Sequence, residues 1–298
     1  MRICSFLPSA TEIIYALNAD KQLVGVTHEC DYPLDAKNKP VVVKGAVNTK
    51  DMDSKSIDEI IVKMVREQKD IYIIDDNKLR DADPDIIIAQ GLCSVCSPYF
   101  KEIDRAKVIL NNKPKIVMLD PHNLEEIFDS IIQVGKAIDK EDKAIELVDK
   151  LRVRIDYIKQ FELEKPNVLA LEWLDPLYTA GHWVPDMINI VGNNLISEGS
   201  KPSRRLEWDE AFNAEPDIII LMACGFNTDR IVREFSKVRD ENWNRLINNK
   251  KVYAVDASAY FNRPGPRVVT GIEILAKIIH SDLFADLKVP NNSFKRII

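Results

Sequence analysis

The chain has 298 residues, of which 46% are hydrophobic and 30% charged, and its formal net charge is −6. This composition is typical of a globular protein, and the length leaves room for two domains. Because no stretch gathers Lys and Arg with interleaved aromatic residues, we expect no nucleic-acid partner, and no apolar run approaches the roughly 20 residues that span a bilayer.

Strands and helices are expected to alternate along both halves of the chain, which predicts βα units and a mainly parallel sheet in each half. The predicted strands are Ile3–Leu7, Leu23–Thr27, Val41–Val43, Ile71–Ile74, Ile86–Ala89, Ile116–Leu119, Val168–Leu171, Ile218–Leu221 and Val252–Val255. Two capping-box signatures, Ser9 to Glu12 and Ser56 to Glu59, predict where two helices begin.

A short repeat relates the two halves. The segment Asp83–Ala89 recurs as Glu215–Leu221, and each copy is an acidic residue, Pro and Asp followed by a run rich in Ile. Such a run is typical of a strand buried on both faces of a parallel sheet. The match predicts two structurally related lobes.

The region between the repeats predicts a stiff connection. Residues 123–161 are almost free of Gly and Pro and have helical periodicity, so we expect two helices separated near Asp139. The predicted organisation is an N-terminal lobe (1–122), linking helices (123–160) and a C-terminal lobe (161–298). The fold class is α/β, with two Rossmann-like lobes that have mainly parallel sheets and are joined by a rigid long helix.

Chemically distinctive residues follow the predicted strands. His28, Glu29 and Cys30 follow one strand, Cys93 and Cys96 follow another, and further such residues follow strands of the second half; these are Glu172, Trp173, His182, Trp183, Cys224, Tyr260 and Arg263. Ligands of open α/β sheets bind beyond the carboxyl ends of the strands. We therefore expect one shared site in a cleft between the lobes.

Several segments carry a family resemblance. The opening Leu7–Glu12, the helical connection and the two lobes resemble the cobalamin-binding component of bacterial importers, which belongs to the helix-linked class (class III) of periplasmic binding proteins. That class also binds siderophores, haem and metal ions. His28–Pro33, Thr179–Pro185 and Arg263–Arg267 are similar to a subgroup that lacks signal peptides. The resemblance implies a non-catalytic protein that binds a corrinoid or a related metal chelate.

Under this hypothesis, Trp173 and Trp183 cover the ligand ring, His182 approaches its metal, and Arg263 holds a peripheral anionic group. The full predicted ligand-binding set is Ser9, Glu29, Glu172, Trp173, His182, Trp183, Tyr260 and Arg263. Simpler readings stay open. Arg263 could form a surface salt bridge, Ser9 could only cap its helix, and Trp173 could only plug the edge of a lobe.

The cysteines suggest an alternative. Thiolates from Cys30, Cys93, Cys96 and Cys224, with His28 as a possible replacement, would suit zinc or an iron–sulfur cluster serving electron transfer or sensing. Free cysteines are also commonly buried as small hydrophobic residues, and this reading is preferred for Cys4. A thiol enzyme is disfavoured because no set of nucleophile, base and orienting residue stands out.

The remaining histidines and tryptophans are assigned structural roles. His122 is expected to cap the linking helix, His280 to end the last helix, and Trp208 and Trp243 to pack within helices.

The start of the chain and its odd number of cysteines favour the cytoplasm. Residue 3 already begins a predicted strand, so we expect no signal peptide, and five cysteines suit a reducing compartment. A chain whose leader had been removed would instead work outside the cytoplasm. A membrane transporter therefore stays an open partner.

Overall fold

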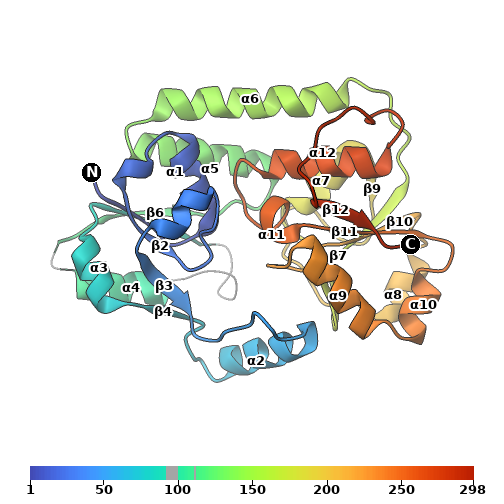
Figure 1. The fold of residues 1–298 in the computed structure, drawn as a ribbon, viewed down its shortest axis with the longest axis horizontal. Coiled ribbons are helices and arrows are strands. Elements are labelled where there is room, and N and C mark those ends of the chain that lie inside the picture. Colours follow the sequence, from blue (N-terminus) through green and yellow to red (C-terminus); the bar gives the residue numbers. More distant parts are fainter. Residues whose placement is uncertain (92–99, 111) are drawn as a thin grey trace. The chain divides into compact units, whose positions relative to one another are not determined.

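The computed structural model describes residues 1–91, 100–110 and 112–298, which form two compact units (Figure 1). The N-terminal unit comprises Met1–Met52, Ser56–Pro121 and Glu125–Lys150. The C-terminal unit comprises Asp53–Lys55, His122–Leu124 and Leu151–Ile298. No helix within the described ranges is long and apolar enough to cross a membrane.

The N-terminal unit is built on a six-stranded sheet in the order β4-β3-β2-β1-β5-β6. Its strands are β1 (Ile3–Ser5), β2 (Leu23–Thr27), β3 (Val41–Gly45), β4 (Tyr72–Ile74), β5 (Ile86–Gln90) and β6 (Lys115–Leu119). All pairs are parallel except β3 with β4. The predicted strands of the first half are therefore confirmed to within two residues at each end.

Helices cover both faces of this sheet because its central strands are apolar on both sides. They include α1 (Pro8–Ala16), α3 (Asp76–Ala82) and α4 (Phe100–Ile109), whereas α2 (Ser54–Arg66) lies between β3 and β4 in the chain. Cys4, Phe6, Ile87 and Ala89 pack in one buried core with residues of α3 and α4. Helix α1 lies on the opposite side of the sheet (Figure 1).

The C-terminal unit repeats this plan with a sheet in the order β12-β11-β10-β7-β8, and β9 pairs with β7. The strands are β7 (Asn167–Leu174), β8 (Leu177–Thr179), β9 (Asn193–Asn194), β10 (Ile218–Leu221), β11 (Lys251–Val255) and β12 (Phe294–Arg296). Strands β7, β10 and β11 run parallel, as predicted. The sequence analysis missed β8, β9 and β12, which are short.

Helices of the C-terminal unit connect these strands. They are α7 (Val184–Val191), α8 (Trp208–Asn213), α9 (Thr228–Val238), α10 (Glu241–Leu246), α11 (Ala257–Tyr260) and α12 (Val268–Ile279). Trp243 is buried and its ring packs edge-to-face on Trp208, which confirms the structural role predicted for both. His280 follows α12, and its Nε2 lies 2.6 Å from the carbonyl oxygen of Val191.

The two helices predicted between the halves are present as α5 (Leu124–Ala137) and α6 (Glu141–Lys159). Gly135 of α5 faces Ala144 of α6 so closely that a Cβ at Gly135 would lie 2.4 Å from the Ala144 Cβ. The two helices can therefore approach only because position 135 has no side chain.

Both capping-box predictions are wrong. Helix α1 begins at Pro8 after Leu7, so Ser9 lies inside the first turn and its buried hydroxyl makes no hydrogen bond in the described structure. Proline at the first helical position presets the helical φ, which moves the start upstream. Helix α2 begins at Ser54, two residues before Ser56, because a carboxylate elsewhere in the fold accepts the hydrogen bonds of Ser54.

Candidate functional site

Hydrogen bonds join the segments that follow the parallel strands of the C-terminal unit. The amide of Cys224, after β10, donates to the carbonyl of Glu172 in β7 at 3.0 Å, and the Glu172 carboxylate accepts the amide of Gly181 at 3.2 Å. The amide of Gly225 donates to the side chain of Asn262, after β11, at 3.2 Å. Glu172 and Trp173 were predicted to follow a strand ending at Leu171, but β7 continues to Leu174, so both lie within it. The hydrogen bonds join Glu172 to the segments that carry His182 and Cys224, and the full predicted set stays a prediction.

His182 is held in an unusual backbone conformation at this edge. Its φ of 54° lies in the left-handed region, which is uncommon for a residue with a side chain. The backbone is fixed on both sides, because its amide donates to Lys201 at 2.6 Å and its carbonyl accepts the amide of Ser200 at 3.0 Å. The imidazole stacks on Trp183 with ring centroids 5.7 Å apart. Strain of this kind is often found at functional positions.

Trp183 is only 5% exposed, and its indole N–H donates to the carbonyl of Phe261 at 2.7 Å. In this structure the indole supports the imidazole of His182 and ties the start of α7 to the segment after β11. Its predicted contact with a ligand ring stays a prediction.

His122 is a neighbour of the site that sequence reasoning assigned only to helix capping. Its ring lies 5.9 Å from that of His182 between centroids, at an angle of 40°. The next residues are also attached to this region, since the amide of Leu124 donates to Asp186 of α7 at 3.1 Å. Nothing in the sequence around His122 indicates this pairing, because its partner lies 60 positions away.

Trp173 is partly exposed near the end of β7. Its indole N–H donates to the carbonyl of Ser54 at 3.1 Å, and its ring lies 5.3 Å from that of Phe226. The guanidinium of Arg230 covers the Phe226 ring at 3.7 Å. The indole is therefore oriented by one hydrogen bond and one aromatic contact.

The segment after β11 presents the remaining predicted residues. Arg263 is 9% exposed, and its Nη2 donates to the Ser258 hydroxyl at 3.3 Å. Tyr260 ends α11, and the Arg267 guanidinium lies 5.5 Å from its ring. Arg263 is thus a largely buried cation, and its predicted contact with an anionic group of a ligand stays a prediction.

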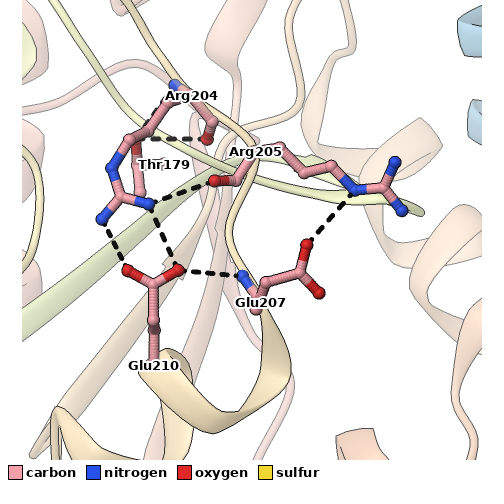
Figure 2. Close-up of polar contacts among 5 residues, drawn as sticks. All are labelled: Thr179, Arg204, Arg205, Glu207 and Glu210. Atoms are coloured by element: carbon pink, nitrogen blue, oxygen red, sulfur yellow. Dashed lines mark hydrogen bonds and ion pairs between the residues drawn. The ribbon is translucent and has the colours of Figure 1, made fainter.

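An ionic network fixes the segment that supports Gly181 and His182 (Figure 2). Arg204 donates to both carboxylate oxygens of Glu210, at 2.7 and 3.2 Å, and the Glu207 amide donates to the same carboxylate. These bonds hold the pKa of Glu210 below its usual value, the Arg204 hydrogen bond being the larger cause. The Arg204 backbone also exchanges hydrogen bonds with Thr179 of β8.

The N-terminal unit places Cys30 in a buried hydroxyl network. Cys30 is 3% exposed, and its sulfur lies 3.1 Å from the Thr11 hydroxyl and 3.3 Å from the Thr27 hydroxyl. Thr11 also donates to Ser5 at 2.9 Å. Cys30 is therefore buried as a small polarizable residue in this structure, and its predicted role as a metal ligand stays a prediction.

His28 and Glu29 lie on the surface beside this network. His28 Nε2 is 3.2 Å from the Glu29 carboxylate, and both side chains are exposed by a third or more. Gly45 leaves room for the imidazole, since a Cβ there would lie 3.2 Å from His28 Nε2. Both residues are accessible to a ligand.

The proposed thiolate metal centre stays a prediction. Among the described residues, no three His, Cys, Asp or Glu side chains are grouped so that they could hold a metal ion. Cys93 and Cys96 lie outside the described residues, and Cys30 and Cys224 belong to different units. Cys4 is a core residue of β1, as predicted, and burial raises the pKa of its thiol to about 12.

A family profile and a relative of known sequence indicate the same family for this chain. A family profile described as "Periplasmic binding protein" matches residues 3–259. An uncharacterized ABC transporter substrate-binding lipoprotein of Bacillus subtilis, YvrC, is 24% identical over 296 residues, covering 96% of this chain and 82% of the relative.

Two solved structures show the same fold. The periplasmic vitamin B12-binding protein BtuF of Vibrio cholerae is 20% identical with a TM-score of 0.65, covering 96% of this chain and 98% of its own. A periplasmic haem-binding protein of Pseudomonas aeruginosa is 15% identical with a TM-score of 0.71, covering 99% and 97%.

Proposed function

Because this chain belongs to the periplasmic binding protein family, we propose that it binds a corrinoid or a related metal chelate without transforming it. Members of this family bind solutes and are not enzymes. The observation that carries the proposal is the hydrogen-bonded edge of the C-terminal sheet, where His182 is held in a strained backbone conformation and the segment that carries it is bonded to Glu172, the residue before the partly exposed Trp173.

The side chains at this edge suit a flat ligand that contains a metal. An imidazole nitrogen ligates cobalt and iron, and an indole face packs on a conjugated ring. Trp183, which is buried behind the His182 ring, would fix the imidazole. Arg263 would hold a carboxylate or phosphate of the ligand if its side chain turns outward.

The comparisons support the ligand class without choosing among its members. One structural relative binds vitamin B12 and another binds haem, and both ligands are metal-bearing macrocycles. We place cobalamin first because of the motifs shared with cobalamin-binding proteins, with haem and iron chelates as the next candidates. We also propose a membrane transporter as partner, since relatives of this chain are ABC transporter substrate-binding proteins.

The test is a set of titrations with cyanocobalamin, hemin and a ferric hydroxamate, each followed by visible absorbance. We expect one of these to bind the wild-type protein with 1:1 stoichiometry. In His182→Asn, affinity should fall roughly tenfold, equivalent to about 1.4 kcal/mol. Asn is chosen because it tolerates the left-handed backbone that His182 adopts.

His280→Asn is the matched control, because its ring contacts the carbonyl of Val191 and it was not predicted to bind the ligand. This variant should bind like the wild type. Absence of binding to all three chelates would contradict the proposal. Equal losses in both histidine variants would remove His182 from the site.

A further inference from the structure

A buried carboxylate is linked to the indole of Trp173 through Ser54. Glu234 of α9 is 3% exposed, and one of its oxygens accepts both the amide of Ser54 at 2.6 Å and the Ser54 hydroxyl at 2.7 Å. A buried carboxylate is costly unless it is hydrogen-bonded. Ser54 is the first residue of α2, and the amides of the first helical turn need acceptors outside the helix.

Lys237, which pairs with Glu234, cannot take over this role. Lys237 Nζ lies 3.9 Å from the other Glu234 oxygen, but the lysine side chain is 64% exposed. An ion pair with an exposed lysine contributes little to stability, because water screens the lysine charge. The two donors of Ser54 therefore provide the close contacts of this carboxylate, and they fix the position of Ser54 in return.

Ser54 also contacts Trp173, the aromatic residue that is predicted to bind the ligand. Its carbonyl accepts the indole N–H of Trp173 at 3.1 Å. The carboxylate, the first residue of α2 and the indole thus form one chain of hydrogen bonds. The ring of the indole also contacts the ring of Phe226, with centroids 5.3 Å apart.

We propose that Glu234 is a positioning residue that sets the orientation of Trp173 through Ser54 and thereby sets the affinity for the ligand. The effect on ligand affinity rests on the proposed function, whereas the effect on the orientation of Trp173 does not. The orientation of the indole can be measured without a ligand, so the two ideas can fail separately.

The first test is a double-mutant cycle on chelate affinity, with cyanocobalamin and hemin as probes. Glu234→Ala should weaken binding about fivefold in the wild-type background, the effect of about one hydrogen bond. In the Trp173→Phe background, which has no indole N–H, the same substitution should have almost no effect. An equal loss in both backgrounds would show a general structural role and would overturn the proposal.

The second test uses fluorescence of the ligand-free protein. The difference between the emission spectra of the wild-type and Trp173→Phe proteins isolates the emission of Trp173. Glu234→Ala should shift this emission to longer wavelength as the indole loses its anchor, whereas Glu234→Gln, which keeps an oxygen acceptor, should leave it near the wild-type value. Unchanged emission in Glu234→Ala would overturn the proposal even if no chelate binds.

Ser54→Ala provides a milder variant should Glu234→Ala fail to fold. It removes one donor to Glu234 but keeps the amide and the carbonyl that Trp173 uses. We expect a smaller shift of the Trp173 emission to longer wavelength. The loss of chelate affinity should also be smaller, and it should vanish in the Trp173→Phe background. A loss of affinity that persists in the Trp173→Phe background would contradict the chain of hydrogen bonds.

Discussion

Glu210 shows how one ion pair near the site can be tested by its titration. Arg204 and the Glu207 amide both donate to its carboxylate, so its pKa in the folded protein lies below the ordinary value of 4.5. A lowered pKa means that the pair stabilises the fold above about pH 4.5 and that this contribution is lost as pH falls through the folded pKa.

The prediction is that Arg204→Gln returns the pKa of Glu210 toward 4.5, because the Arg204 hydrogen bond is the larger cause of the shift. Carbon-detected NMR titration of the glutamate carboxyls would measure it. Glu146, whose pKa is lowered by Lys150, serves as an internal control that should not move. An unchanged Glu210 pKa in the variant would contradict the assignment.

Single residues also show what the sequence can and cannot predict. Cys4 could be assigned to the core because it lies within an apolar strand. Ser9 could not be placed correctly, because a capping motif is local while the helix start was determined by Pro8. The pairing of His122 with His182 and of Trp173 with Ser54 depends on contacts across 60 and 119 positions, which no short pattern records.

At the scale of elements, packing of β1, β2 and β3 depends on one glycine. A Cβ at Gly25 would lie 2.6 Å from the Cys4 sulfur and 2.9 Å from Val42 Cγ1. We expect Gly25→Ala to lower the free energy of unfolding by about 1 to 3 kcal/mol through overpacking. Urea unfolding checks this.

The Cys4→Ala/Gly25→Ala double variant supplies the control. Because it removes the closest clashing atom, its loss should be smaller than the sum of the two single losses. A Gly25→Ala protein as stable as the wild type would show that the sheet can absorb the methyl group.

Two ion pairs of α6 allow a contact between helices to be compared with a contact within one helix. Arg154 makes a two-pronged pair with Glu273 of α12, at 2.8 and 2.7 Å, and also donates to Thr270. Lys150 instead pairs with Glu146 on the same helix, where both side chains are more than 60% exposed and water screens the pair. We expect Arg154→Met to cost about 1 to 2 kcal/mol in urea unfolding, and Lys150→Met to cost clearly less. Equal costs would contradict a bracing role for Arg154.

Elements differed in how well the sequence predicted them. The apolar runs of β5 and β10 were found because burial on both faces leaves a continuous pattern. Strands β8, β9 and β12 have only two or three residues, so no alternation can develop in them. They form because the neighbouring edges of β7 and β11 offer hydrogen-bonding partners.

At the scale of the whole molecule, the short repeat proved to mark equivalent places in two sheets. Strand β5 lies between β1 and β6, and β10 lies between β7 and β11, so each copy is an interior strand. The two-lobed α/β class could thus be predicted from the sequence. The ligand could not, because the same fold serves many ligands and the identity of a ligand depends on a few side chains.

The chain contains two compact units, and we expect each to unfold in its own calorimetric transition, so that the transition a ligand shifts reports the unit it contacts. Ligand at 100 times its Kd stabilises the folded state by about 2.7 kcal/mol, which corresponds to a rise in Tm of about 5 to 10 °C. If the C-terminal residues alone bind the chelate, calorimetry should show a shift in the transition of that unit and none in the other. Contacts with Glu29 would shift both, and Glu29→Ala would then restore the N-terminal transition to its ligand-free temperature. A chelate that moves neither transition at this concentration would contradict binding at the edge of the C-terminal sheet.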